Sequence, residues 1–73
     1  MTISEKKDDI FMLQVRLYRM LQTRKELTAE ECNKIFDKYK LFEYIELCYE
    51  IYRVQGDEAN YNDVVGYLEV QGF

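Results

Sequence analysis

The sequence predicts an all-α protein, a compact bundle of about four short helices in one domain that covers residues 1–73. The chain contains no proline and only three glycines, so almost nothing interrupts a helix. Its hydrophobic fraction is 48%, which is too high for a disordered chain. A chain of this length buries only about 60% of its unfolded surface, which leaves room for a thin core and no deep substrate cavity.

The first helix is predicted over residues 8–24, after a flexible tail of residues 1–7. Within residues 8–24 apolar side chains recur at intervals of three and four, the spacing of an amphipathic helix. These side chains are Ile10, Leu13, Leu17, Met20 and Leu21. Two aspartates open this helix and Arg24 with Lys25 closes it, which complements the helix dipole at both ends.

The second helix is predicted from Ala29 to about Tyr39. Thr28 is expected to cap it while Glu31 reaches back to the cap, and Leu27 is expected to pack against Cys32. Its narrow apolar face consists of Cys32, Ile35, Phe36 and Tyr39. Cys32 and Cys48 both lie on apolar faces, so we interpret them as reduced, buried residues and not as a disulfide.

A break is expected near Lys40, because the apolar faces before and after it point in opposite directions at 100° per residue. The third helix is predicted over residues 41–54, with Gly56 ending it in a left-handed conformation. It is the most apolar helix, so we expect it to be central and packed on more than one side. Its apolar residues are Leu41, Phe42, Tyr44, Ile45, Leu47, Cys48, Tyr49, Ile51 and Tyr52.

The last segment is predicted to form a helix over residues 61–71, after a loop over residues 57–60. Asn60 or Asn62 is expected to cap this helix. Its valines and Tyr67 are also good strand formers, so a strand is the alternative. We favour the helix because a single strand would have no partner within this chain.

The sequence contains little that could carry catalysis. It has no histidine, and Ser4 near the N-terminus is the only serine. Two cysteines without a histidine cannot complete a tetrahedral zinc site, and the three glycines are too far apart for a phosphate-binding loop. The acidic turn over residues 57–63 lacks the ligand order of a calcium loop. We therefore expect no enzymatic activity, no catalytic residue, no cofactor and no metal.

Charge is unevenly distributed along the chain. Residues 1–40 contain nine Lys and Arg against seven Asp and Glu, whereas residues 41–73 contain Arg53 alone against seven acids. Such an acidic surface attracts basic protein surfaces and repels nucleic acid and anionic lipid. No signal peptide and no membrane-spanning run is recognisable, so we expect a cytoplasmic protein that binds neither nucleic acid nor membranes.

Two sets of residues are candidates for binding a partner protein. Phe11, Val15 and Tyr18 form a second apolar strip on the first helix, away from its core stripe and beside Met12. This strip is either covered by the last helix or exposed as an interface, including one between copies of the chain. The second set is acidic, suits a basic partner surface and consists of Glu43, Glu46, Glu50, Asp57 and Glu58.

A family resemblance rests on two segments, KYKLFEYI over residues 38–45 and YRVQGDE over residues 52–58. With them the chain resembles, over nearly its whole length, a family of small uncharacterised bacterial helical proteins, domain of unknown function 3791. Many members have His-Thr where this chain has Arg53 and Val54. Members are often encoded beside a protein resembling ADP-ribosyltransferases, so the resemblance implies a partner or antitoxin-like role.

These observations favour a non-enzymatic protein-binding module, antitoxin-like toward a neighbouring ADP-ribosyltransferase-like protein. Two alternatives remain open at the level of sequence. One is a self-associating structural protein that uses the strip of Phe11, Val15 and Tyr18. The other is an acidic phage or mobile-element inhibitor whose surface mimics nucleic acid.

Overall fold

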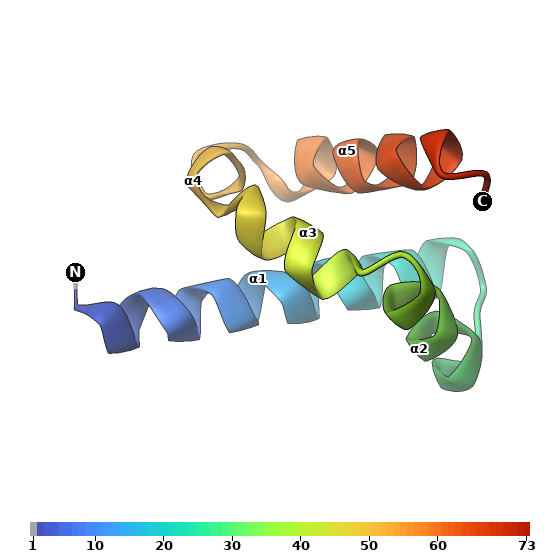
Figure 1. Ribbon diagram of the computed structural model, residues 1–73, viewed down its shortest axis with the longest axis horizontal. Coiled ribbons are helices and arrows are strands. Elements are labelled where there is room, and N and C mark those ends of the chain that lie inside the picture. Colours follow the sequence, from blue (N-terminus) through green and yellow to red (C-terminus); the bar gives the residue numbers. More distant parts are fainter. Residues whose placement is uncertain (1) are drawn as a thin grey trace.

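Five α-helices follow one another in the computed structural model, which describes residues 2–73 (Figure 1). They are α1 (Ile3–Arg24), α2 (Ala29–Lys38), α3 (Leu41–Leu47), α4 (Tyr49–Tyr52) and α5 (Asp57–Val70). The described residues contain no strand, so the all-α prediction is confirmed and the last segment is a helix. None of these helices is both long and apolar enough to cross a membrane.

Helix α1 starts earlier than its apolar spacing predicted. Thr2 has extended backbone angles, and its hydroxyl oxygen accepts a hydrogen bond from the Glu5 amide at 3.1 Å. A threonine in this position satisfies an amide that the first turn leaves without a helical partner. Residues 3–7, expected in a flexible tail, therefore form the first turns of α1, and Met1 lies outside the described residues.

The predicted cap at the start of α2 and the predicted break after it are both confirmed. The Thr28 hydroxyl accepts from the Glu31 amide at 3.1 Å, and the Glu31 carboxylate accepts from the Thr28 amide at 2.8 Å. This reciprocal pair is the predicted capping box. Lys40 adopts a left-handed conformation with φ of 55°, and this residue separates α2 from α3 where the change of apolar phase predicted a break.

The third predicted helix is divided into two. Cys48 has a ψ of 3°, far from the value near −42° of an α-helix, and its amide is shared between the carbonyls of Tyr44 and Ile45. The next peptide is thereby rotated out of the helical ladder, and α4 is turned across the direction of α3 (Figure 1). The prediction of one continuous helix over residues 41–54 is therefore wrong.

Helix α5 begins four residues before the predicted start. Gly56 has extended backbone angles and precedes the first residue of α5, so it does not end the preceding helix in a left-handed conformation. Asp57 and Glu58 occupy the first turn of α5, where negative charge is favourable. Asn60 is not a cap, because it lies inside α5 and is fully buried.

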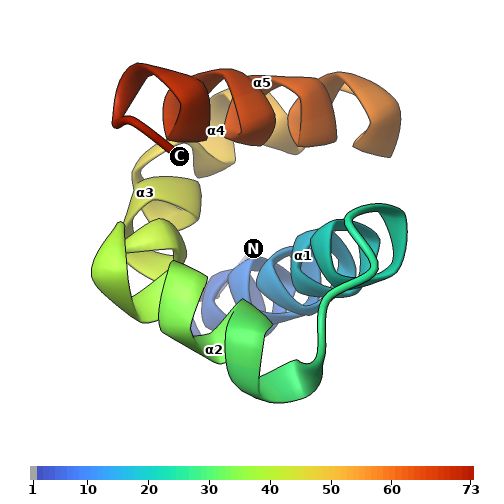
Figure 2. The same cartoon turned by 90° about the vertical axis from the view of Figure 1, so that its right-hand side faces the viewer.

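The core takes buried side chains from all five helices. Figure 2 shows α5 on one side of the molecule, α1 and α2 on the opposite side, and α3 connecting them. The buried apolar residues are Leu13, Leu17, Leu21, Cys32, Phe36, Leu41, Ile45, Tyr49, Tyr52, Tyr61, Val64 and Leu68. Cys32 is buried as predicted, Cys48 is half-buried, and both thiols are free.

Tyrosine side chains fasten the far end of α5. The rings of Tyr44 on α3 and Tyr67 on α5 stack with their centroids 3.9 Å apart. The Tyr67 hydroxyl donates to the carbonyl of Tyr39 at 3.3 Å, and the ring of Phe73 lies edge-on to that of Tyr39. The last helix is thus held to the α2–α3 region as well as to α1.

Asn60 offers a direct test of the junction between α4 and α5. Its side-chain amide donates to the carbonyl of Tyr52 at 2.9 Å in a fully buried position. Asn60→Ala leaves that carbonyl without this donor, so we expect the free energy of unfolding in urea to fall by about 1–3 kcal/mol.

The matched control is Asn62→Ala, which changes an exposed asparagine in the same helix. We expect this control to alter the free energy of unfolding by less than about 0.5 kcal/mol. Equal effects of the two substitutions would show that the buried hydrogen bond does not hold α4 to α5.

Candidate functional site

The apolar strip predicted on α1 is divided by the fold. The ring of Tyr18 lies 5.0 Å from that of Phe36 and 6.4 Å from that of Phe42, measured between centroids. Its hydroxyl lies 2.5 Å from the side-chain oxygen of Asn33 and donates to it. Tyr18 therefore belongs to the edge of the core, and α2 and α3 cover it. Of the two alternatives for the strip, covering by the last helix and exposure, neither describes this residue.

The N-terminal half of the strip remains at the surface. Phe11 is 61% exposed and the neighbouring Met12 is 51% exposed, whereas Val15 is half-buried. Gln14, on the same helix, donates to the carbonyl of Phe42 at 2.9 Å. This hydrogen bond holds the start of α3 next to α1. We call Phe11 and Met12 the α1 patch.

Three of the five predicted acidic residues form ion pairs with basic side chains. Glu50 lies 3.3 Å from Lys6 and 3.1 Å from Arg53, and Asp57 lies 3.3 Å from Arg16. Lys6 and Arg16 belong to α1, so these pairs connect α1 to α4 and to the start of α5. The negative charge of these two acids is balanced within the fold.

Glu58 makes the most extensive of these ion pairs. Both of its carboxylate oxygens accept from the guanidinium of Arg24, which also lies over the ring of Tyr61 at 4.8 Å from its centroid. The hydrogen bonds from Arg24 hold the pKa of the Glu58 carboxyl below its usual value. Glu58 therefore fastens α5 to the end of α1.

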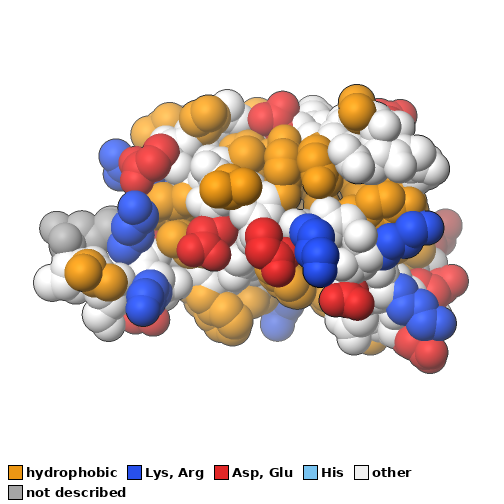
Figure 3. Space-filling model, viewed as in Figure 1, with side chains coloured by type: hydrophobic (Ala, Val, Ile, Leu, Met, Phe, Trp, Pro, Cys, Tyr) orange, Lys and Arg blue, Asp and Glu red, His pale blue; other side chains and the backbone are white. Residues whose placement is uncertain are grey.

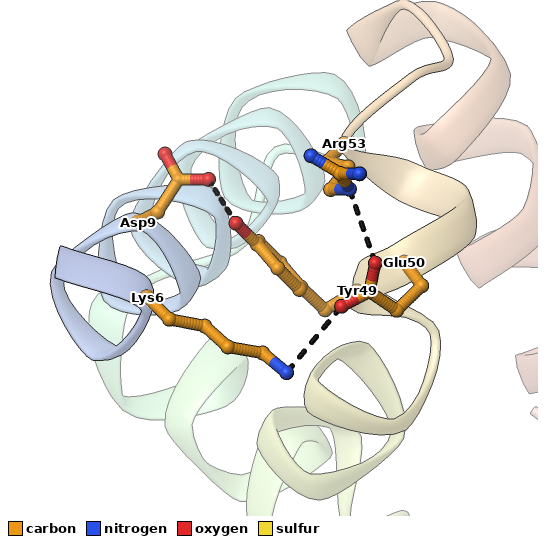
Figure 4. A network of polar contacts seen from close by, with 5 residues as sticks. All are labelled: Lys6, Asp9, Tyr49, Glu50 and Arg53. Carbon is orange, nitrogen blue, oxygen red and sulfur yellow. Dashed lines mark hydrogen bonds and ion pairs between the residues drawn. The ribbon is translucent and has the colours of Figure 1, made fainter. Parts of the chain in front are cut away.

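A polar network joins the N-terminal half of α1 to α4 (Figure 4). The ring of Tyr49 points from α4 toward α1, and its hydroxyl donates to the Asp9 carboxylate at 2.5 Å. This hydrogen bond raises the pKa of the Tyr49 hydroxyl above its usual value. The ring is flanked by Lys6, Glu50 and Arg53, so charged side chains surround Tyr49 at the start of α4.

An open pocket of about 300 Å³ lies beside this network. Its lining consists of Thr2, Ile3, Lys6, Tyr49, Glu50 and Arg53. The three charged groups pair with one another, which leaves no convergent set of free polar groups for a substrate.

Within residues 2–73 no three His, Cys, Asp or Glu side chains gather as metal ligands. Burial raises the pKa of the Cys32 thiol, which disfavours the reactive thiolate.

The other two predicted acids lie on α3, close in sequence to exposed apolar residues, of which Leu47 and Ile51 were expected to be packed. Glu43 and Glu46 are exposed on α3 and make no ion pair with any residue from 2 to 73. Leu47 is 85% exposed, Ile51 57% and Val54 75%. Figure 3 shows acidic side chains over α3 close to hydrophobic side chains over α3 and α4.

We call Glu43, Glu46, Leu47, Ile51 and Val54 the α3–α4 face. The expectation that this region packs on more than one side is correct for α3 against α1 and α2, but it is wrong for Leu47 and Ile51. A signal for their exposure is present in the sequence. Leu47 and Ile51 are four residues apart and, in helical projection, lie on the side opposite Leu41, Ile45, Tyr49 and Tyr52.

The comparisons with known proteins identify one family. A family model described as "Protein of unknown function (DUF3791)" matches residues 13–70, which is most of the chain. This match agrees with the family resemblance found in the sequence. Neither the curated proteins nor the solved structures gave a match.

The ion pair of Glu58 predicts part of the pH dependence of stability. Its pKa is lowered in the folded protein, so its contribution is complete above the unfolded pKa of about 4.3 and is lost as pH falls through the folded value. We expect the urea midpoint to fall less between pH 6 and pH 2 in Glu58→Gln than in the unchanged protein.

Glu69→Gln is the control for this measurement. Glu69 is an exposed acid of α5 that makes no ion pair with the described residues. The control is expected to retain the full decrease of the urea midpoint with pH. A Glu58→Gln variant with that same full decrease would contradict a stabilising role of the Arg24 pair.

Proposed function

The chain belongs to the DUF3791 family, and on that premise we propose that it is a non-enzymatic protein-binding module. The observation that carries the proposal is the α3–α4 face, where two acids without ion pairs are followed along the chain by three strongly exposed apolar residues. Exposed apolar side chains that lie together on a small protein are typical of association sites. Flanking charges then restrict which partners can dock.

The remaining geometry supports binding better than catalysis. The pocket beside α4 is open and its charged groups are paired with one another. Cys32 is buried, and its raised pKa keeps the sulfur protonated at neutral pH. A small helical bundle with apolar side chains at its surface fits a protein that acts by contact alone.

The finer proposal comes from the family resemblance. That resemblance implies a bacterial protein encoded beside an ADP-ribosyltransferase-like protein, and we propose a cytoplasmic location from the sequence alone. We propose that the chain neutralises such an enzyme in an antitoxin-like manner, by covering the surface on which the enzyme acts. This mechanism requires no chemistry from the chain itself.

One observation favours self-association as a second candidate function. The α1 patch leaves an aromatic ring and a methionine side chain largely exposed, and a symmetric dimer would cover them. Mimicry of nucleic acid has less support, because Glu50, Asp57 and Glu58 are neutralised by basic residues. Such a mimic would need those charges free for its partner.

Affinity capture tests the proposed function. The tagged chain is expressed in cells of its source, and retained proteins are identified by mass spectrometry and then purified for mixing with the chain. We expect one partner that forms a complex of fixed stoichiometry with the purified chain. The same mixing is repeated with Phe11→Ser/Met12→Ser, which removes the α1 patch without entering the core.

Two results would contradict the binding proposal. A chain that is retained alone and whose mass rises with concentration would favour self-association. A chain that is retained alone and stays monomeric would leave protein binding without support. A partner released steeply with salt would instead favour the mimicry of nucleic acid.

A further inference from the structure

We propose that the α3–α4 face binds an amphipathic helix of the partner that carries Lys or Arg beside its apolar residues. This inference rests on the proposed function and specifies which surface binds and what chemistry the partner presents. It depends on three observations: the position of the exposed apolar row, the two unpaired acids beside it, and the absence of any strand from residues 2–73.

The exposed apolar residues follow one another along the chain, from the end of α3 through α4 to the turn after α4. Leu47, Ile51 and Val54 are spaced by four and three residues, and all three are more than half exposed. The opposite row of buried residues faces the core, so the fold offers the outer row nothing to pack against. Covering such a row requires apolar side chains from another molecule.

Charge selects among the possible occupants of this row. Glu43 and Glu46 lie four residues and one residue before Leu47 on α3 and make no ion pair with the described residues. Glu50 is neutralised by Lys6 and Arg53, so the free negative charge is concentrated at the α3 end of the face. A partner with Lys or Arg at that end gains favourable charge pairs.

The same charge disfavours a second copy of this chain as the occupant. A symmetric contact through the α3–α4 face would bring the same patch of both copies together. With the two copies antiparallel, Glu43 and Glu46 would face the α4 end of the other copy, where Lys6 and Arg53 are already paired with Glu50 and offer no free positive charge. Self-association would therefore use the α1 patch and not this face.

The secondary structure of the chain favours a helical occupant. Residues 2–73 contain no strand edge onto which an extended peptide could add, and amides of α3 such as those of Tyr44 and Cys48 donate within their own helix. Recognition must therefore use side chains. An amphipathic helix supplies apolar side chains on one face and charged side chains along its flanks.

The α3–α4 face and the α1 patch can be tested separately. Phe42, which adjoins α1 through Gln14, lies about 140° around α3 from Leu47 in helical projection. Substitutions of Leu47 and Ile51 change only exposed side chains. They should therefore leave the fold and the α1 patch intact.

Nuclear magnetic resonance titration with synthetic peptides tests the inference. The probe is a helix of about 18 residues, roughly five turns, with leucines at intervals of four and three and lysines on both flanks. A matched peptide carries glutamate in place of every lysine. We expect the lysine peptide to shift the methyl signals of Leu47, Ile51 and Val54, and the glutamate peptide to shift none of them.

Variants quantify the two parts of the face. Leu47→Ser/Ile51→Ser is expected to weaken binding of the lysine peptide by roughly tenfold or more, as truncation of interface anchors does. Glu43→Gln/Glu46→Gln should weaken binding at low salt and reduce its salt dependence. Phe11→Ser/Met12→Ser is the control and should bind the lysine peptide as the unchanged chain does.

The inference is overturned if the lysine peptide fails to bind, if both peptides bind equally, or if the shifts centre on Phe11 and Met12. Its failure is distinguishable from failure of the proposed function. A captured partner that binds the Leu47→Ser/Ile51→Ser variant as tightly as the unchanged chain would retain the function and refute this face. Absence of any captured partner would refute the function itself.

Discussion

The packing of the other helices against one apolar row of α1 is the interaction on which the rest of the structure depends. Leu13, Leu17 and Leu21 are almost completely buried, and α2, α3 and α5 all pack against α1. A chain of this size forms only a thin core, so a single long helix has to serve as the common support. Basic residues beside that row then pair with acids of α4 and α5, which fixes where the later helices lie.

This use of charge changes the meaning of the acidic C-terminal half. From residue 41 onward acids greatly outnumber bases, yet Glu50, Asp57 and Glu58 are balanced by Lys6, Arg16, Arg24 and Arg53. Exposed pairs of this kind contribute little individually, but together they orient α4 and α5 on α1. The charge that remains free on α3 is consequently local, and it lies next to exposed apolar side chains.

Local signals were sufficient for much of the fold. The capping box of Thr28, the change of phase at Lys40 and the three-four spacing all act within one or two helical turns. The bend at Cys48 could not be predicted, because the buried row that starts at Leu41 has the same spacing in a straight or a bent helix. Asn60 was misassigned because asparagine is equally suited to cap a helix and to bind a buried carbonyl, and its true partner is set by packing. For the candidate site, the sequence pattern was sufficient to predict that the acids on α3 are exposed and to identify Phe11 as a candidate for exposure. Leu47 and Ile51 were missed because apolar character was equated with burial.

The shortness of α4 has a consequence for motion. A helix of one turn has almost no cooperative length, so its backbone amides are protected from solvent exchange mainly by tertiary contacts. The principal anchors are the bond from Tyr49 to Asp9 and that from Asn60 to the Tyr52 carbonyl. Opening of α4 is thereby coupled to both ends of the chain, since one anchor lies on α1 and the other on α5. A ligand that closes over Ile51 is therefore expected to slow hydrogen exchange in α4 and to keep both anchors closed.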